Sequence, residues 1–236
     1  MSSQRLEAPL PFDYRIVRSH RRTAAIQIRA DAVEVRVPHW VGADWIDGFV
    51  RSREQWIRSR LASVRAQRDA HLIEVARGAR VPFRGQALRL DWQPGAAAAV
   101  AHRDDRLEVT LSRRIRRPQE EVVADQLRQW LQRQATDILC ARLWALAAHT
   151  GLQPSGVSVR GFRRRWGSCD SRGRIALNWR LVLAHPEAAD YVLIHELCHL
   201  RHFDHSPRFW QLVARHCAGY RQHQDYFRER ACWLEW

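Results

Sequence analysis

Apolar and polar residues alternate with a period of two near the start of the chain. The segments AAIQIR and AVEVRVP carry apolar residues at every second position, which is the pattern of strands that turn one face toward a core. We therefore expect strands over Tyr14–Arg18, Ala24–Arg29 and Ala32–Pro38. A loose lead over residues 1–12 precedes them, and Asp31 suits a tight connection.

The period changes to three and four residues between positions 43 and 68, which predicts one amphipathic helix. Trp45 and Trp56 recur on its apolar side and are expected to pack in a core or between domains. The many arginines of this helix are interpreted as a solvated face.

Strand patterns return further along the chain, and glycine and proline separate them as turn residues. They cover residues 72–76, 79–92 and 100–111. A long helix is expected over 118–150, because Pro118 suits the start of a helix and Gly151 suits its end.

The pattern in the last part of the chain predicts a β-hairpin followed by helices. Residues 155–184 form the hairpin, with the arms SGVSVRGF and RIALNWRLVLA and turn residues at 170–173. A helix starts near Pro186, and two terminal helices follow over 206–217 and 219–235. Together these patterns predict an α+β fold, with a β-rich N-terminal subdomain over residues 1–112 that contains the amphipathic helix, and a second subdomain over residues 113–236.

The composition narrows the possible partners and compartment. The formal charge is +14, and arginine supplies every positive side chain because the chain has no lysine. Such a surface attracts polyanions, so non-specific binding of nucleic acid is possible. The five cysteines are odd in number and lack C-x-x-C spacing, which predicts neither a disulfide framework nor a thiolate zinc site. The N-terminus is polar and basic, and no apolar run approaches the ~18 residues that span a membrane, so we expect a cytoplasmic protein without a membrane partner.

The helix that starts near Pro186 carries the candidate chemistry. His195-Glu196-Leu197-Cys198-His199 is an H-E-x-x-H pattern. Residues four positions apart project from one face of a helix, so the two imidazoles can bind one Zn²⁺ ion. Glu196 lies one position round, where a general base would activate a zinc-bound water. The alternative is a core helix whose histidines form only hydrogen bonds.

The residues around this pattern resemble a known family. The segment from Arg164 to Trp210 is similar to the YgjP-like metallopeptidase domain, which is related to the SprT and WLM zincins. The similarity rests on R-W-G-S-C, on Leu177-Asn178, on D-Y-V-x-x-H-E-L-x-H-L and on H-S-x-x-F-W, and it extends into the N-terminal half. It implies a zincin-like, gluzincin-type subdomain in which a hairpin precedes the H-E-x-x-H helix, with a zinc-dependent hydrolase site.

Two residues compete to be the third zinc ligand. The resemblance implies His205. Its spacing from His199 equals that of metzincins, but His202 stands where those proteins have glycine, and no methionine follows. His202 shares the helical face of His195, yet the two lie about 10 Å apart along a helix axis, whereas zinc–nitrogen bonds are about 2 Å. The expected ligand set is therefore His195, His199 and His205.

The segment from Arg165 to Cys169 has two interpretations. Its strand lines the cleft, where Gly167 permits close backbone approach and an extended peptide pairs with the edge, or it packs beneath the helix. Cys169 is also a possible fourth ligand that would silence the metal, whereas Cys198 faces away from the histidines.

Two further sets of residues near the site are expected to matter. Phe209 and Trp210 are expected to lie in the core and to fix the loop that carries His205. The negative oxygen that develops during hydrolysis needs a donor, and the sequence does not rank the candidates, which are Tyr220, Tyr226, Asn178 and Arg165.

These patterns predict a zinc-dependent metallohydrolase that acts as a metallopeptidase on protein or peptide, with Glu196 as its base. One alternative keeps the metal but hydrolyses nucleotides or phosphate esters, although Mg²⁺ and Mn²⁺ prefer oxygen ligands to imidazole. Another is a protein-processing factor associated with nucleic acid, for which no recognised nucleic-acid motif is present.

Overall fold

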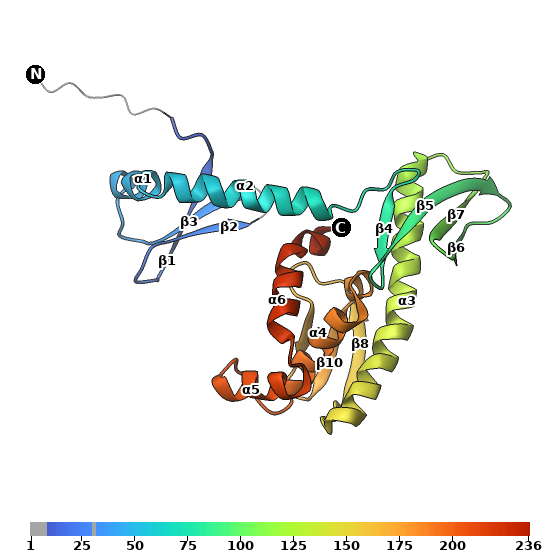
Figure 1. Cartoon of the computed structure of the whole chain (residues 1–236). Coiled ribbons are helices and arrows are strands. Elements are labelled where there is room, and N and C mark those ends of the chain that lie inside the picture. The colour runs from blue at the N-terminus through green and yellow to red at the C-terminus, as the bar shows by residue number, and fades with distance from the viewer. Residues whose placement is uncertain (1–8, 30–31) are drawn as a thin grey trace, which may run out of the picture. The chain divides into compact units, whose positions relative to one another are not determined.

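The computed structural model describes residues 9–29 and 32–236 (Figure 1), so most of the expected N-terminal lead and Asp31 lie outside the described residues. The chain forms two compact units, Met1–His71 and Leu72–Trp236. The sequence placed this division between residues 112 and 113. The difference arises because the four strands between residues 80 and 112 pack on the long helix that follows them, and therefore belong to the second unit.

The first unit contains one three-stranded sheet and two helices, namely β1 (Tyr14–Ser19), β2 (Ala25–Arg29), β3 (Ala32–Pro38), α1 (Ala43–Arg51) and α2 (Glu54–His71). The three predicted strands are confirmed. The central strand β3 pairs in parallel with β1 and antiparallel with β2. The single helix predicted over 43–68 is wrong, because the chain breaks at Ser52, whose hydroxyl donates to the carbonyl of Phe49 at 2.8 Å.

The core of the first unit is aliphatic rather than aromatic. It is formed by Val33, Val35, Val37, Val41, Ile46, Val50, Ile57 and Leu61. Trp45 is 52% exposed and Trp56 is 51% exposed, so the expectation that they pack in a core is wrong. Trp45 instead stacks on Phe49, with ring centroids 5.1 Å apart.

The second unit begins with a four-stranded sheet of order β4-β5-β7-β6 that packs on α3. These elements are β4 (Arg80–Phe83), β5 (Gln86–Gly95), β6 (Ala99–Arg103), β7 (Arg106–Ser112) and α3 (Gln119–Thr150). The strand predicted over 72–76 is absent. The long helix is confirmed, and Gly151 ends it with a φ of 70°, a left-handed conformation that glycine adopts without strain.

A second sheet, of order β8-β10-β9, packs beside the other half of α3. Its strands are β8 (Gly156–Arg160), β9 (Gly167–Cys169) and β10 (Arg174–Asn178). The two predicted hairpin arms are parallel neighbours, so that hairpin is wrong. The antiparallel hairpin joins β9 to β10 through the predicted turn, where the Asp170 carboxylate accepts from the backbone of Arg172 and Arg174.

Helical elements complete the second unit. They are η1, a 3₁₀ helix (Trp179–Leu183), α4 (Pro186–Cys198), α5 (Pro207–His216), α6 (Tyr220–Glu229) and the 3₁₀ helix η2 (Ala231–Glu235). The predicted helix starts are confirmed, whereas η1 replaces the end of an expected strand because the side chain of Asn178 accepts from the backbone N–H of Arg180. Within the described residues, none of the helices has the length and apolar character needed to cross a membrane.

Candidate metal centre and cleft

Three histidines converge at the end of α4. His195 lies in its last turn, His199 caps it, and the chain then turns before Pro207 starts α5, so that His205 comes back toward the helix. One ring nitrogen from each histidine lies within 4.8 Å of the others. The structure therefore brings together the three histidines that the sequence proposed as ligands.

The spacing of these nitrogens fits one tetrahedral metal ion. The Nε2 atom of His195 is 3.2 Å from Nε2 of His199 and 3.2 Å from Nε2 of His205. Two ligands about 2.0–2.1 Å from a zinc ion at the tetrahedral angle lie about 3.4 Å apart. The second nitrogen of His199, Nδ1, faces the carbonyl of His202 at 2.9 Å. A proton on that Nδ1 leaves the Nε2 lone pair free for a metal.

The electrostatics of the cluster also favour ligation. Burial, followed by the neighbouring His199 and His205, lowers the pKa of His195 from 6.5 to about 3. Burial also lowers the pKa of His199. Both imidazoles are therefore neutral near pH 7, which is the protonation state that binds metal.

Aromatic rings support the cluster from beneath. The ring of Phe209, which is fully buried, stacks on His199 with centroids 4.6 Å apart and lies 4.9 Å from both His195 and His205. Trp210 stacks on Tyr220 at 5.3 Å. The expectation that Phe209 is a core residue is confirmed. Its three contacts fix the orientation of all three imidazoles.

Glu196 lies against the backbone of β9. Only 5% of the residue is exposed, and burial raises its pKa from 4.5 to about 8, against the opposing effect of Arg165. A Cβ atom at position 167 would lie 2.6 Å from Oε1 of Glu196, which is closer than real Cβ atoms approach. Gly167 is therefore required because the Glu196 side chain occupies the space that any other residue would fill.

A cleft of about 490 Å³ opens beside this carboxylate. Residues from the start of β9 and the loop before it, from α4, from α6 and from η2 line it, namely Arg165, Trp166, Gly167, Tyr191, Val192, His195, Glu196, Gln224, Phe227, Arg228 and Ala231. Both interpretations of the 165–169 segment hold in part. Its first residues line the cleft, while Trp166 also packs on Phe227 at 4.6 Å and Cys169 contacts the core.

Comparison with known proteins identifies the family of the chain. Residues 22–230 match the family model described as YgjP-like, metallopeptidase domain. The chain belongs to the YgjP-like family. It is accordingly a metallopeptidase, and the family implies a divalent metal. A solved structure, the metallopeptidase zymogen of Pyrococcus abyssi abylysin, is 26% identical over 37% of this chain and 89% of its own length, with a TM-score of 0.34. No curated protein matches the chain.

Several residues weighed from the sequence lie outside the metal cluster of this YgjP-like protein. His202 contributes a main-chain carbonyl to His199 rather than a ring nitrogen to the cluster. Cys169 is not among the clustered groups, and burial raises its pKa to about 11. Cys198 is fully buried. All the potential metal ligands in the described cluster are therefore imidazole nitrogens.

The four candidate oxyanion donors differ in their hydrogen-bond partners and in whether they line the cleft. Asn178 is fully buried and its amide donates to two main-chain carbonyls of the loop before β9. The hydroxyl of Tyr226 accepts from the backbone N–H of His185, and the Tyr220 hydroxyl accepts from Arg221. Arg165 is the one of the four that lines the cleft with Glu196.

Sequence reasoning missed part of the cleft wall in this YgjP-like chain. Tyr191 was given no role from the sequence, yet it lines the cleft with its ring 6.0 Å from His195, and burial raises its pKa to about 12. Gln224 lines the same cleft from α6. The available signal was the spacing of Gln224 and Phe227, which lie three positions apart on one helical face.

Proposed function

We propose that the protein is a zinc metallopeptidase in which His195, His199 and His205 hold the ion and Glu196 is the general base. The observation that carries the proposal is the cluster of three Nε2-centred imidazoles beside a buried carboxylate. Three protein nitrogens leave one tetrahedral position open, which is typical of catalytic rather than structural zinc. Neutral nitrogen donors favour zinc over Mg²⁺ or Ca²⁺.

The reaction needs a base, an oriented substrate and a donor for the developing oxyanion. A bound zinc ion would polarise the substrate carbonyl and lower the pKa of water in the site. Glu196 accepts the proton of the attacking water and passes it to the leaving amine. The carboxylate must be ionised to accept that proton, and a bound zinc ion would lower the pKa of Glu196 from the raised value of the metal-free site toward the working pH. Arg165 is proposed as the donor that faces the developing negative oxygen.

The edge of β9 is proposed as the support for the substrate backbone. In the order β8-β10-β9 this strand pairs on one side only within its sheet, and it contacts α4. An extended peptide can add to such an edge through main-chain hydrogen bonds, which bind a backbone without regard to its side chains. A peptide paired with β9 would then lie close to Glu196, whose side chain packs against Gly167.

The proposal is tested with purified protein, zinc and an unstructured peptide substrate. We expect one zinc ion per chain, hydrolysis of the peptide, and loss of activity by about 10³-fold or more in Glu196→Gln with zinc still bound. A Glu196→Gln protein that cleaves as fast as the wild type would refute the role of the base. A protein that binds no zinc would refute the metal assignment.

A metal-dependent phosphate-ester hydrolase fits the site less well. The described cluster contains no carboxylate oxygen, whereas Mg²⁺ and Mn²⁺ sites are built from oxygen ligands. Nucleotides assayed beside peptides with the same zinc-loaded preparation separate the two activities.

A further inference from the structure

A run of arginines lies immediately before β9. Arg163, Arg164 and Arg165, called the arginine loop below, are consecutive and exposed, and Arg160 at the end of β8 is exposed as well. In the part of the chain that the structure describes, no carboxylate lies within ion-pair distance of Arg160, Arg163 or Arg164. Their charge is therefore not neutralised within the second unit.

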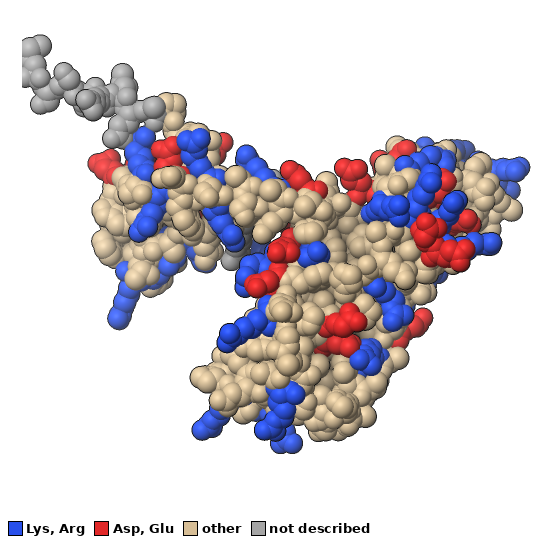
Figure 2. Space-filling model, in the orientation of Figure 1, with Lys and Arg blue, Asp and Glu red and all other residues tan. Residues whose placement is uncertain are grey.

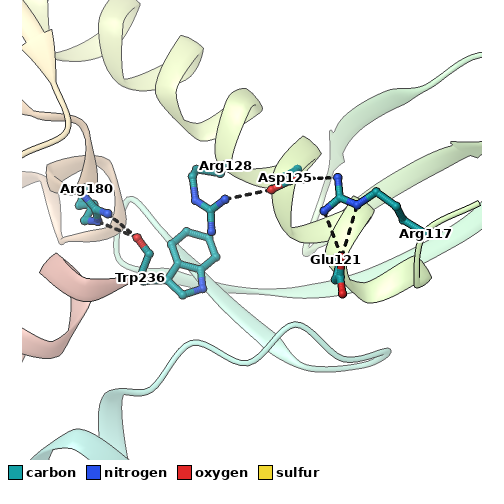
Figure 3. Close-up of polar contacts among 6 residues, drawn as sticks. All are labelled: Arg117, Glu121, Asp125, Arg128, Arg180 and Trp236. Carbon is teal, nitrogen blue, oxygen red and sulfur yellow. Dashed lines mark hydrogen bonds and ion pairs between the residues drawn. The ribbon is translucent and has the colours of Figure 1, made fainter. Parts of the chain in front are cut away.

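This lack of pairing contrasts with other arginines of the same unit. Around β4–β7 and the start of α3, basic and acidic side chains are interspersed on the face shown in Figure 2. Arg77 pairs with Asp91 there, and Arg103 pairs with Glu108. Figure 3 shows Arg117 held by Glu121 and Asp125, with Arg128 on the same Asp125. The arginine loop is thus a local excess of positive charge, as are Arg113 and Arg114, which likewise have no ion-pair partner among the described residues.

The backbone of the arginine loop is clamped at both ends. The amide nitrogen of Asn178 donates to the carbonyls of Phe162 and Arg165, at 2.9 Å each. The buried guanidinium of Arg180 also donates to Phe162, at 3.4 Å, and to the main-chain oxygen of Trp236, as Figure 3 shows. The Arg165 side chain lies over the Phe162 ring at 5.0 Å. A backbone held in this way presents its side chains at fixed positions, which lowers the ordering cost of binding.

The arginine loop also adjoins the cleft. Arg165 and Arg228 line the cleft, and Arg228 is paired with Asp225. Glu196 is the one acidic group among the lining residues. Three extended residues span about 10 Å, so a peptide supported along β9 brings a few of its side chains within reach of the loop. Opposite charge at such a surface selects the partner more than it adds raw affinity.

We propose that the arginine loop selects peptides with acidic side chains next to the scissile bond. This inference rests on the proposed peptidase function and assigns its substrate class. Guanidinium groups bind carboxylates through paired hydrogen bonds. An acidic peptide fits better than a nucleic acid, because the loop continues directly into the strand edge beside Glu196, where main-chain pairing and charge recognition act on one ligand.

The test compares matched peptides that carry Asp or the uncharged isostere Asn at each position flanking the scissile bond. We expect an Asp/Asn ratio in kcat/KM of about two- to fivefold for each favoured position at low salt, which is the range for exposed ion pairs, and a smaller ratio at 1 M salt. In Arg163→Ala/Arg164→Ala the ratio is expected to fall toward one. Arg113→Ala/Arg114→Ala removes the same charge from two exposed adjacent arginines of the same unit, and should keep the wild-type ratio.

The outcomes separate this inference from the proposed function. Cleavage of all peptides with an Asp/Asn ratio near one, unchanged in the loop variant, overturns the inference and leaves the peptidase intact. No cleavage of any peptide by zinc-loaded protein overturns both. A fluorescent single-stranded oligonucleotide is titrated in parallel. If the loop variant loses oligonucleotide binding and keeps the Asp/Asn ratio, the loop serves nucleic acid and the inference is wrong.

Discussion

The buried carboxylate of Glu196 should destabilise the metal-free protein, and Glu196→Gln should relieve this. With a pKa of about 8 in the folded state against 4.5 otherwise, the folded state holds the proton more tightly than the unfolded state between these values. Stability from this group is therefore fully present below pH 4.5 and is lost as pH rises toward 8. Glutamine has no such proton, so its contribution does not vary with pH.

The size of the effect follows from the same two pKa values. Each pKa unit corresponds to 1.36 kcal/mol, so the carboxylate costs about 1 kcal/mol at pH 5 and about 3 kcal/mol at pH 7. The stability difference between Glu196→Gln and the wild type should thus grow by about 2.5 kcal/mol across this interval. The histidines of the cluster are present in both proteins, so their own pH dependence cancels in the difference.

The measurement is urea unfolding of both metal-free proteins at pH 5, 6 and 7, followed by tryptophan fluorescence. Residues 72–236 contain eight of the eleven tryptophans, so the signal reports mainly on the unit that holds the site. Zinc should shrink the difference at pH 7, because a nearby cation favours the ionised carboxylate. A difference that stays constant with pH, or a variant less stable than the wild type at pH 7, would refute the reasoning.

Three other predictions follow from single contacts. Gly167→Ala should lower kcat by about 10–100-fold in steady-state assays with zinc still bound, because the new Cβ displaces Glu196. Gly156→Ala is the control, because a Cβ at position 156 meets nothing within 4 Å. His205→Ala should weaken zinc binding by at least tenfold in a chelator competition, whereas His202→Ala should not, because His202 offers its carbonyl and not its ring. Asn178→Ala should cost about 2–4 kcal/mol in urea unfolding, since it removes buried hydrogen bonds to two loop carbonyls.

The metal cluster was the part of the molecule most open to prediction from sequence. The four-residue spacing of His195 and His199 fixes their common face on any helix. The choice of His205 over His202 rested on the family resemblance and on the rise of the helix, and the structure places His205 in the cluster. The contact between Glu196 and Gly167 was not predictable in detail, because it joins residues far apart in sequence and depends on how β9 lies on α4.

The errors in the fold have a common physical source. Alternation of apolar residues shows that a segment is a strand but not which strand it pairs with, so two arms expected to be antiparallel proved to be the parallel pair β8 and β10. The break at Ser52 depends on one side-chain hydrogen bond within a pattern that is otherwise helical. The domain boundary was misplaced because the apolar face of α3 does not reveal which sheet it covers.

The position of α3 in the chain determines the order in which parts of the second unit can fold during synthesis. Strands β4–β7 leave the ribosome before the helix that covers them. Phe83 therefore stays uncovered until Trp130 has been synthesised, because the two rings pack together with centroids 5.0 Å apart. At about 5–20 residues per second that interval lasts seconds, during which the sheet exposes an apolar face and is open to aggregation. Any need for a chaperone should therefore be greatest before α3 has left the ribosome. The three histidines of the metal cluster are synthesised later still, when α3 can already cover the β4–β7 sheet.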